Sequence, residues 1–430
     1  MVLAFWGRVQ DREHQTDSPW LSCMWFGGIV SEDQQVTVVG AGPTGLLTAL
    51  GLAQQGVSVS VVERAPALQD MPRAIVYHWS TLDGLARLGL LEKASAAGFL
   101  KQDYAYRVRA TGEIISYGLA ALDGKVDRPY NLHLGQGALA EVILAELNNY
   151  DNVRLLWSHE VAGIEQDATG VDVALRGPDG HSTLRSQWLV GADGAGSTVR
   201  RLLGMEFEGM TWPERFVATN VRFPDDRDGW AQSTFYLDDV YGAIIAKIDE
   251  SGAHGLWRYT YMEDADLPAD SIDERMPSFL SAVFGPEVAD EIEVVASSPY
   301  RMHQRAASAF RSGRALLAGD AAHATNPTGG LGLTMGLFDA YALIEGLGAV
   351  ARGRASDEVL TEYARLRRAA FVDKASPRAA SNKKLLFHSS DPVKREQDLE
   401  VFRRMSRDKD FAAEALYFTK TLESPSLLTV

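Results

Sequence analysis

A glycine-rich turn between two β-branched runs constrains the fold of this 430-residue chain more than any other feature. The first run, residues 36–39, reads VTVV, and GAGPTG follows it directly. A helical pattern over residues 46–55 and a second run over 57–62 complete a strand, turn, helix and strand. In that context a GxGxxG turn binds a dinucleotide, so the sequence predicts a Rossmann-like parallel sheet.

Each glycine of this turn has a predicted role. Gly40 permits the tight turn, Gly42 lets the backbone approach a pyrophosphate, and Gly45 permits close packing of the helix on the strand. The pyrophosphate is expected at the N-terminus of the helix. Glu63, 23 positions after Gly40, is placed to accept hydrogen bonds from ribose hydroxyls. The alternative is a glycine turn that binds no nucleotide.

A second unit of this kind covers residues 314–343, RALLAGDAAHATNPTGGLGLTMGLFDAYAL. A short buried strand over 315–318 is predicted to place Asp320 at its carboxyl end, where open α/β sheets bind ligands. Pro327 and the glycines after it indicate that the backbone comes close to a ligand. A helix is predicted over 333–350, and its positive N-terminal end suits a ligand that becomes anionic on reaction, such as a reduced flavin ring. A βα unit with a tight turn and no ligand is the alternative.

A third turn lies between these two, in residues 188–201, WLVGADGAGSTVRR. Here a strand runs into Asp193, and Ser197 is a predicted helix cap. Because parallel strands end at a common edge, all three turns are expected to meet at one edge of one sheet.

Residues 204–300 have a different character, because strand-like runs dominate and aromatic residues recur along them. These aromatic residues include Phe235, Tyr236, Tyr241, Trp257, Tyr259 and Tyr261. An antiparallel sheet with one aromatic face would cover a flat ligand on one side. Plain core packing is the alternative for each of these side chains.

Composition excludes several classes of partner. The net charge of −15, from 42 basic and 57 acidic residues, argues against nucleic acid and anionic membrane surfaces. Cys23 is the single cysteine, so no internal disulfide is expected and a reducing, cytoplasmic location is predicted. The nine histidines show no paired spacing, so no metal centre is expected. No apolar run approaches about 18–20 residues, so no membrane-spanning helix is expected.

The three motifs, in this order, resemble the single-component flavin-dependent aromatic hydroxylases, the group of para-hydroxybenzoate hydroxylase and phenol hydroxylase. The resemblance covers about residues 36–353 and is specific at the motifs. It implies bound FAD, NADH or NADPH as co-substrate, and hydroxylation of a small electron-rich aromatic substrate by O2 through a flavin C4a-hydroperoxide. It leaves a homodimer open.

The resemblance also implies which residues contact the cofactor. Arg73 and Ala74 match an arginine–alanine pair beside the flavin, and Gln136 matches a glutamine before a long helix; a solvated arginine and a helix-capping glutamine are the alternatives. The implied FAD-binding set is Gly40, Gly42, Gly45, Glu63, Arg64, Arg73, Ala74, Gln136, Asp193, Asp320, Gly330, Gly332, Leu333 and Thr334.

Three positions depart from the family pattern. Thr334 stands where asparagine is usual, and Leu331 where glutamine or lysine is frequent, so different redox tuning of the flavin is expected. Ile248 aligns with the arginine that holds a carboxylate in benzoate hydroxylases, which favours a neutral substrate.

The predicted catalytic residues are Pro327, in the loop against the flavin ring, and three candidates for ionising the substrate, Tyr77, His78 and Tyr236; His303 is a fourth. A structural hydrogen-bonding role is the alternative for His78. Competing functions are a related flavoprotein that performs Baeyer–Villiger oxidation, epoxidation or halogenation, and a non-catalytic nucleotide-binding protein. A halogenase is disfavoured because the chain has no lysine-bearing WxWxIP-type stretch.

The predicted fold class is α/β: a Rossmann-like FAD-binding domain with an inserted antiparallel-sheet substrate domain and a C-terminal helical region. The predicted divisions are a poorly ordered extension at 1–35; an FAD-binding domain at 36–103, 128–203 and 301–385; a substrate-binding sheet domain at 104–127 and 204–300; and a helical tail at 386–430.

Overall fold

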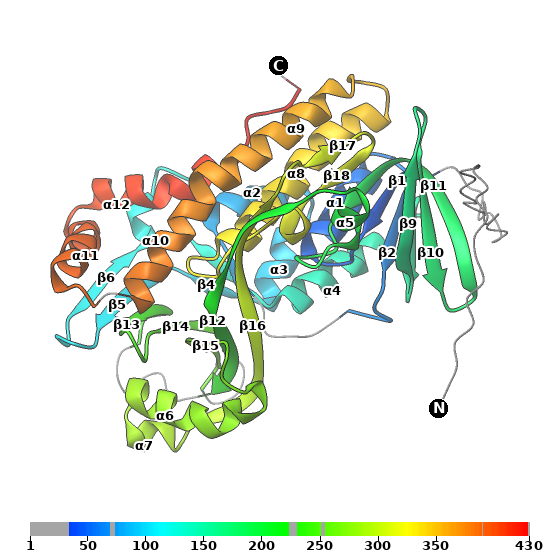
Figure 1. The fold of residues 1–430 in the computed structure, drawn as a ribbon. Helices are drawn as coiled ribbons and strands as arrows, with labels where there is room; N and C mark the ends of the chain where they lie inside the picture. Colours follow the sequence, from blue (N-terminus) through cyan, green and yellow to red (C-terminus); the bar gives the residue numbers. More distant parts are fainter. Residues whose placement is uncertain (1–33, 69–73, 223–229, 251–253, 389, 429–430) are drawn as a thin grey trace, which may run out of the picture.

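The structure is a computed structural model that describes residues 34–68, 74–222, 230–250, 254–388 and 390–428. The predicted N-terminal extension lies almost entirely outside these ranges, and so does Arg73. Within them the chain forms two eight-stranded sheets, a three-stranded sheet and the helices that cover them (Figure 1). The predicted fold class, an α/β domain with a second sheet and C-terminal helices, is confirmed.

The first sheet contains the predicted Rossmann-like unit. Its path is β17 (Arg311–Ser312), β18 (Ala315–Leu317), β11 (Gly180–Gly191), β1 (Gln34–Val39), β2 (Val59–Glu63) and β8 (Val153–Trp157), with β10 (Val171–Gly177) and β9 (Glu160–Gln166) joined to β11. The strands from β18 to β8 are parallel. The strands of this parallel stretch are mostly buried because helices cover both faces, as parallel sheets require.

The helices of the first domain come from several parts of the chain. They are α1 (Pro43–Gln54), α2 (Trp79–Arg87), α3 (Leu91–Ala97), α4 (Gln136–Leu147), α5 (Thr198–Leu202), α8 (Leu331–Ala351) and α9 (Glu358–Ala369). The core between α1 and α8 is built from small and branched side chains such as Leu47, Leu50 and Leu343. A π-helical turn (Ala370–Ala375) joins α9 to α10 (Ser376–Phe387).

The helix α8 is longer and more apolar than the sequence analysis allowed. Over its 21 residues it is long and apolar enough to cross a membrane by length and composition alone. However, 72% of its most apolar window is buried inside the protein, where it packs on α1 and α9. We therefore interpret α8 as the central core helix of the first domain.

The second sheet is mostly antiparallel. Its order is β19 (His323–Ala324), β16 (Glu293–Ala307), β12 (Phe207–Arg222), β15 (Leu256–Asp264), β14 (Ala243–Asp249), β13 (Ser233–Leu237), β5 (Asp103–Val108) and β6 (Ile114–Gly118). The segment 104–127, which the sequence assigns to the substrate-binding sheet domain, contains the hairpin of β5 and β6, and β5 pairs with β13 in this sheet. The long strands β12 and β16 run from the first domain into the sheet and connect the two halves (Figure 1).

The second sheet has two different faces. Its outer face, which carries Trp257, Tyr259 and Tyr261, packs on α6 (Ile272–Phe284), with α7 (Pro286–Ala289) beside it. Its inner face carries Phe216 and Met262 and is covered by residues of α10 and α11 (Pro392–Arg407). The last helices, α12 (Lys409–Leu416) and a 3-10 turn (Tyr417–Leu422), return toward α2 and α8.

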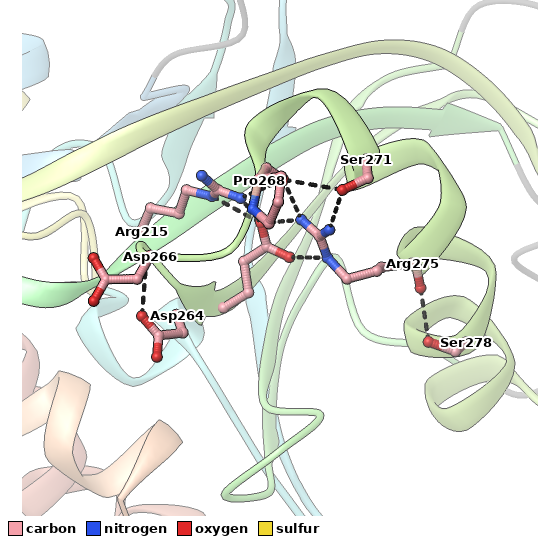
Figure 2. A network of polar contacts seen from close by, with 8 residues as sticks. Arg215, Asp264, Asp266, Pro268, Ser271, Arg275 and Ser278 are labelled. Carbon is pink, nitrogen blue, oxygen red and sulfur yellow. Dashed lines mark hydrogen bonds and ion pairs between the residues drawn. The ribbon is translucent and has the colours of Figure 1, made fainter.

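A buried ion cluster fastens α6 to the outer part of the sheet. Figure 2 shows Arg215 of β12 and Arg275 of α6 approaching one carboxylate, which belongs to Glu263 of β15. Arg215 donates from Nε at 2.7 Å and Arg275 donates from Nε at 2.9 Å. Burial opposes ionisation of Glu263, but the hydrogen bonds from Arg275 and Arg215 outweigh it and lower the pKa of this carboxyl group.

The third sheet is small and lies between the two larger ones. It consists of β3 (Val76–Tyr77), β7 (Asn131–His133) and β4 (Phe99–Lys101). The ring nitrogen Nδ1 of His133 lies 2.6 Å from the carbonyl oxygen of Lys247 in β14, which joins this sheet to the inner face of the second sheet. The pattern of the sequence did not predict the small sheet.

Candidate active site

The three predicted turns meet at one edge of the first sheet. Strand pairing places Val39 of β1 beside Gly191 of β11, and Gly191 beside Leu317 of β18. The residues that follow these strand ends therefore form neighbouring turns, and the predicted convergence is confirmed.

The glycines of the first turn have the geometry that the sequence predicted. A Cβ atom on Gly40 would lie 2.3 Å from the carbonyl oxygen of Ala192, and one on Gly45 would lie 2.0 Å from the carbonyl oxygen of Gly40. A Cβ atom on Gly42 would have no atom within 4 Å in the structure. Gly40 and Gly45 are thus required by close packing, whereas Gly42 leaves open space at the N-terminus of α1 for a ligand.

Glu63 is tied to this turn. Its two carboxylate oxygens accept hydrogen bonds from the backbone N–H groups of Ala41, at 2.8 Å, and Ala65, at 2.9 Å. A carboxylate has about four lone-pair directions, so these two bonds leave room for hydroxyl donors. The turn therefore presents a fixed carboxylate beside the open position at Gly42.

Asp193 begins α5. Its carboxylate accepts hydrogen bonds from the hydroxyl of Ser197, at 2.5 Å, and from the N–H groups of Thr198 and Val199. The oxygen of Ser197 in turn accepts from the N–H of Arg200, which confirms Ser197 as a cap. Asp193 thus has a clear structural role in positioning α5, and its contact with a cofactor stays a prediction.

Arg200 joins the second turn to the third. Its buried guanidinium donates to the carbonyl oxygens of Ala321 and Ala195, each at 2.7 Å. The turn at Gly319 is held from the other side, because its N–H donates at 2.9 Å to the buried carboxylate of Asp339 in α8. These bonds fix the backbone around Asp320, whose side chain is exposed at the sheet edge.

Asp339 belongs to a charge network with no solvent exposure. His323 Nε2 lies 2.6 Å from one carboxylate oxygen, and Arg367 Nε donates to the other at 2.7 Å. Arg367 also donates to the carbonyl oxygens of Leu422 and Met335. The network ties the Asp320 turn to α9 and to the C-terminal segment, and sequence reasoning missed it.

The glycine loop after Pro327 leads directly into α8. The helix begins at Leu331, two residues before its predicted start, because Gly330 adopts a left-handed conformation, with φ of 68°, as its cap. The first N–H groups of a helix have no acceptor within it, so this end of α8 is suited to an anionic ligand. Thr334 donates its hydroxyl to the carbonyl oxygen of Gly330, at 2.9 Å, which supports the loop from within.

His78 supports the same loop. Its Nε2 lies 2.8 Å from the carbonyl oxygen of Gly329, which can only accept, so Nε2 carries the proton. Its Nδ1 faces the amide nitrogen of Asn131 at 3.4 Å. Burial lowers the pKa of His78 to about 4. Both ring nitrogens are engaged, and this geometry favours the structural role over the catalytic one.

Tyr77 and Tyr236 face away from the loop. Tyr77 and Leu132, its partner across the small sheet, point into the core against α2 and α8. Tyr236 lies on the outer face of the second sheet with Trp257 and Tyr259. Successive strand residues point to opposite faces, and the sequence could not tell which face was which. Their placement argues against a role for either tyrosine in ionising the substrate.

The aromatic face predicted from residues 204–300 is divided in the same way. Tyr236, Tyr241, Trp257, Tyr259 and Tyr261 pack in the cluster under α6, so the expectation that they cover a ligand is wrong for them. Phe235 lies on the inner face, where Tyr106, Phe216 and Tyr300 join it. The inner face is therefore aromatic, but most of its aromatic residues were not the predicted ones.

The inner face also contains a cation that the sequence analysis missed. Arg258, which is 7% exposed, lies beside Asn220 and donates to its side-chain oxygen at 2.8 Å. Ile248 packs in an apolar cluster with Ile75 and Ala246, as an aliphatic residue should. A buried arginine on this face weakens the argument from Ile248 that the substrate is neutral.

The remaining predicted residues lie on several elements. Gln136 is the first residue of α4, Arg64 is exposed after β2, and Ala74 leads into β3. Gly332 and Leu333 lie in the first turn of α8 and are partly exposed. His303 bonds to the hydroxyl of Thr211, with 2.9 Å between Nδ1 and Oγ1, near Asp320 rather than on the inner face. Their roles stay predictions.

Comparison with known proteins agrees with this geometry. A family model described as "FAD binding domain" matches residues 33–376. The 6-hydroxy-3-succinoylpyridine 3-monooxygenase of Pseudomonas putida (strain DSM 28022 / S16) is 44% identical over 396 residues, which cover 92% of this chain and 100% of that protein. The para-nitrophenol 4-monooxygenase of Pseudomonas sp. (strain WBC-3) is 41% identical, over 87% of this chain and 92% of that protein.

Solved structures give the same result. The crystal structure of the p-nitrophenol 4-monooxygenase from Pseudomonas putida DLL-E4 superposes with a TM-score of 0.87 at 40% identity, covering 91% of this chain and 98% of that one. A ternary complex of aklavinone-11 hydroxylase with FAD and aklavinone superposes with a TM-score of 0.72 at 27% identity, covering 84% of this chain and 71% of that one. The chain belongs to the FAD-binding family of single-component aromatic hydroxylases and is an FAD-dependent monooxygenase.

Proposed function

We propose that the protein uses NADH or NADPH and O2 to hydroxylate a small phenol or hydroxypyridine. The observation that carries the proposal is the common edge at which Val39, Gly191 and Leu317 end, next to a glycine loop that borders an aromatic sheet face. An elongated cofactor bound along this edge would have its nucleotide end at α1 and its ring end at α8.

Separate parts of the chain would hold the cofactor and the substrate. The N-terminus of α1 and Gly42 are suited to hold the pyrophosphate, and Glu63 is suited to hold a ribose. Asp320 and the first turn of α8 complete the proposed cofactor site, with Pro327 at the end that would hold the flavin ring. Bound FAD supplies reductive activation of oxygen. The inner face, covered by α10 and α11, would orient the substrate and exclude water.

The names of the two relatives narrow the proposed substrate. In each name the oxygen is added to a ring carbon opposite a hydroxyl group, and that carbon already carries a substituent, succinoyl in one and nitro in the other. We infer that this chain acts on a ring of the same kind. Because such a carbon has no hydrogen to lose, oxygen addition there would expel the substituent.

The test uses protein reconstituted with FAD. We expect 4-nitrophenol to stimulate oxidation of NADH or NADPH and to release nitrite, whereas nitrobenzene, which lacks the hydroxyl group, should do neither. 6-Hydroxy-3-succinoylpyridine and unsubstituted phenol complete the series. An FAD-loaded protein whose nicotinamide oxidation responds to no phenol or hydroxypyridine would refute the proposal. The cytoplasmic location and the homodimer stay predictions of the sequence.

A further inference from the structure

The small sheet has one apolar face and one polar face. Asn131 and His133 are two residues apart on β7, and Lys101 of β4 pairs directly with Asn131. These three side chains therefore share a face, opposite the one that carries Tyr77 and Leu132. All three are completely buried. We call this set the polar layer.

The polar layer lies between the glycine loop and the inner face. Asn131 is linked through His78 to the carbonyl oxygen of Gly329. On the other side, His133 bonds to the carbonyl oxygen of Lys247 in β14. The polar layer therefore lies between the loop proposed for the flavin ring and the inner face proposed for the substrate.

Two nitrogen atoms of the polar layer lack partners. Neither Lys101 Nζ nor His133 Nε2 has a hydrogen-bond partner among the described residues. Lys101 Nζ lies against the ring of Tyr104, whose hydroxyl oxygen accepts from Asn131 at 2.6 Å. Buried polar atoms without partners are rare in folded proteins, because burial removes their bonds to water.

The protonation states show which partner is missing. The carbonyl oxygen of Lys247 can only accept, so His133 carries its proton on Nδ1, and Nε2 offers a lone pair. Burial lowers the pKa of His133 to about 3, with Lys101 as the next cause, so this ring is neutral. Burial also lowers the pKa of Lys101 well below its usual value, which favours the neutral amine. Both atoms then lack a hydrogen-bond donor.

We propose that the polar layer binds the ring hydroxyl of the aromatic substrate and that Lys101 Nζ accepts its proton, with His133 Nε2 as the neighbouring acceptor. The proposal rests on the proposed function and assigns the substrate-ionising base that sequence reasoning sought in Tyr77, His78, Tyr236 and His303.

The proton transfer is balanced within the site. The substrate O–H bond breaks, an N–H bond forms on Lys101, and the products are an ammonium group and a phenolate. Each new charge has the other as its counter-ion, whereas an ammonium alone would be poorly accommodated at this depth. The phenolate is the more electron-rich form of the ring and is favoured for attack by an electrophilic oxygen.

The charged and titratable groups around Lys101 come from each neighbouring element. Asp103, on β5, raises the pKa of Lys101 and partly opposes the effect of burial. Burial lowers the pKa of His78 and of His133, and the charge of the ammonium form of Lys101 lowers both pKa values further, so both rings are neutral before and after the proton transfer. Tyr104 stays protonated because burial raises its pKa. Lys247, on β14, directs its Nζ toward Phe99 and Trp257, at 5.4 and 5.7 Å from the ring centroids.

The experiment follows the ionisation of a bound probe. 4-Nitrophenol is added to the FAD-loaded protein without nicotinamide, and the visible band of its anion is measured as the pH is varied. In the wild-type protein we expect the bound probe to ionise at a pH about one unit or more below that of the free probe, which is a tenfold change in its ionisation constant. In Lys101→Met the ionisation should move to a pH at or above that of the free probe.

Matched variants separate the base from general effects. Lys93→Met makes the same change at an exposed lysine on α3 and should behave as wild type. Lys101→Arg restores a cation but not a base, so we expect turnover to fall at least about tenfold at a pH where the free substrate is a neutral phenol. FAD absorbance in each variant reports that the site has folded.

Three results would overturn the inference. One is Lys101→Met with bound FAD and a wild-type ionisation curve. The second is an ionisation curve that moves to higher pH than in wild type in His133→Asn but stays at the wild-type pH in Lys101→Met, which would assign the base to His133. The third is full turnover by Lys101→Arg, which would show that no base is needed there. In each case the proposed function would survive if phenols still stimulated nicotinamide oxidation, so the two failures are distinguishable.

Discussion

The buried network around Asp339 makes a quantitative prediction. Asp339 accepts hydrogen bonds from Gly319 N–H and from Arg367 Nε and lies within hydrogen-bonding distance of His323 Nε2, with no solvent exposure. Asp339→Asn keeps the shape of the side chain and removes its charge. Arg367 is then left as a buried cation without its counter-ion, a change that typically costs about 3–5 kcal/mol. We expect the free energy of unfolding to fall by that amount.

A double-mutant cycle isolates the ion pair from other effects. Arg367→Met alone leaves Asp339 without its arginine, Asp339→Leu alone leaves Arg367 without its carboxylate, and each should cost a similar amount. Replacing both groups, with Asp339→Leu and Arg367→Met, removes the uncompensated charge and should cost less than either single change, because an apolar pair of similar volume is often neutral. The coupling energy between the sites should be at least about 2 kcal/mol.

The assay is urea unfolding followed by tryptophan fluorescence, with the midpoint compared at a constant slope. A second measurement, the affinity for FAD, tests the bond to Gly319. Because that bond holds the turn before Asp320, Asp339→Asn should weaken FAD binding more than a mutation of equal cost in α6, such as Met276→Ala. Additive costs in the cycle, or equal FAD affinities in these two variants, would contradict the role assigned to the network.

Two further predictions concern the first turn and the outer sheet. Gly42→Ala should fold like wild type but bind FAD more weakly, because its Cβ enters the open space at α1. Gly45→Ala should also lose about 1–3 kcal/mol of stability, because its Cβ meets the carbonyl oxygen of Gly40. FAD titration measures the affinity and urea unfolding measures the stability, and equal stability losses in the two variants would contradict the reasoning. The lowered pKa of Glu263 means that its contribution to stability is complete above the pKa of the unfolded chain and is lost as the pH falls through the folded pKa. Glu263→Gln should therefore cost about 2 kcal/mol near about pH 7 and progressively less below about pH 4, and a cost that does not change between these pH values would exclude an ionic role for the carboxyl group.

Local signals were sufficient to predict the cofactor edge. The first turn combines strand, glycine spacing, helix and acid within about 30 residues, and each part constrains the others. The turn at Asp320 was predictable for the same reason. Parallel strands end at a common edge, so three separate local patterns gave a correct long-range arrangement without any knowledge of the contacts.

Local sequence patterns could not predict the Asp339 network. Arg367 lies in a charged amphipathic stretch, and charges in such stretches are usually solvated. Its burial depends on the C-terminal segment, whose Leu422 carbonyl oxygen accepts its Nη1–H. A contact between residues 55 positions apart leaves no periodic trace in the sequence, so only the folded structure reveals it.

The proposed base was missed for a different reason, which also explains the wrong aromatic face. Alternation along a strand predicts that half of the side chains share a face, but packing decides which half faces the ligand. On the longer strands of the second sheet, the strand that carries Tyr236 was predicted correctly, but Tyr236 was placed on the wrong face. β4 and β7 have only three residues each, too few to show alternation, so Lys101 and His133 gave no signal at all. The pairing of Lys101 with Asn131 determines which side chains face the second sheet. A shift of that pairing by one residue would turn Leu100 toward the layer and Lys101 into the core, so the identity of the base depends on the register of this short pair of strands.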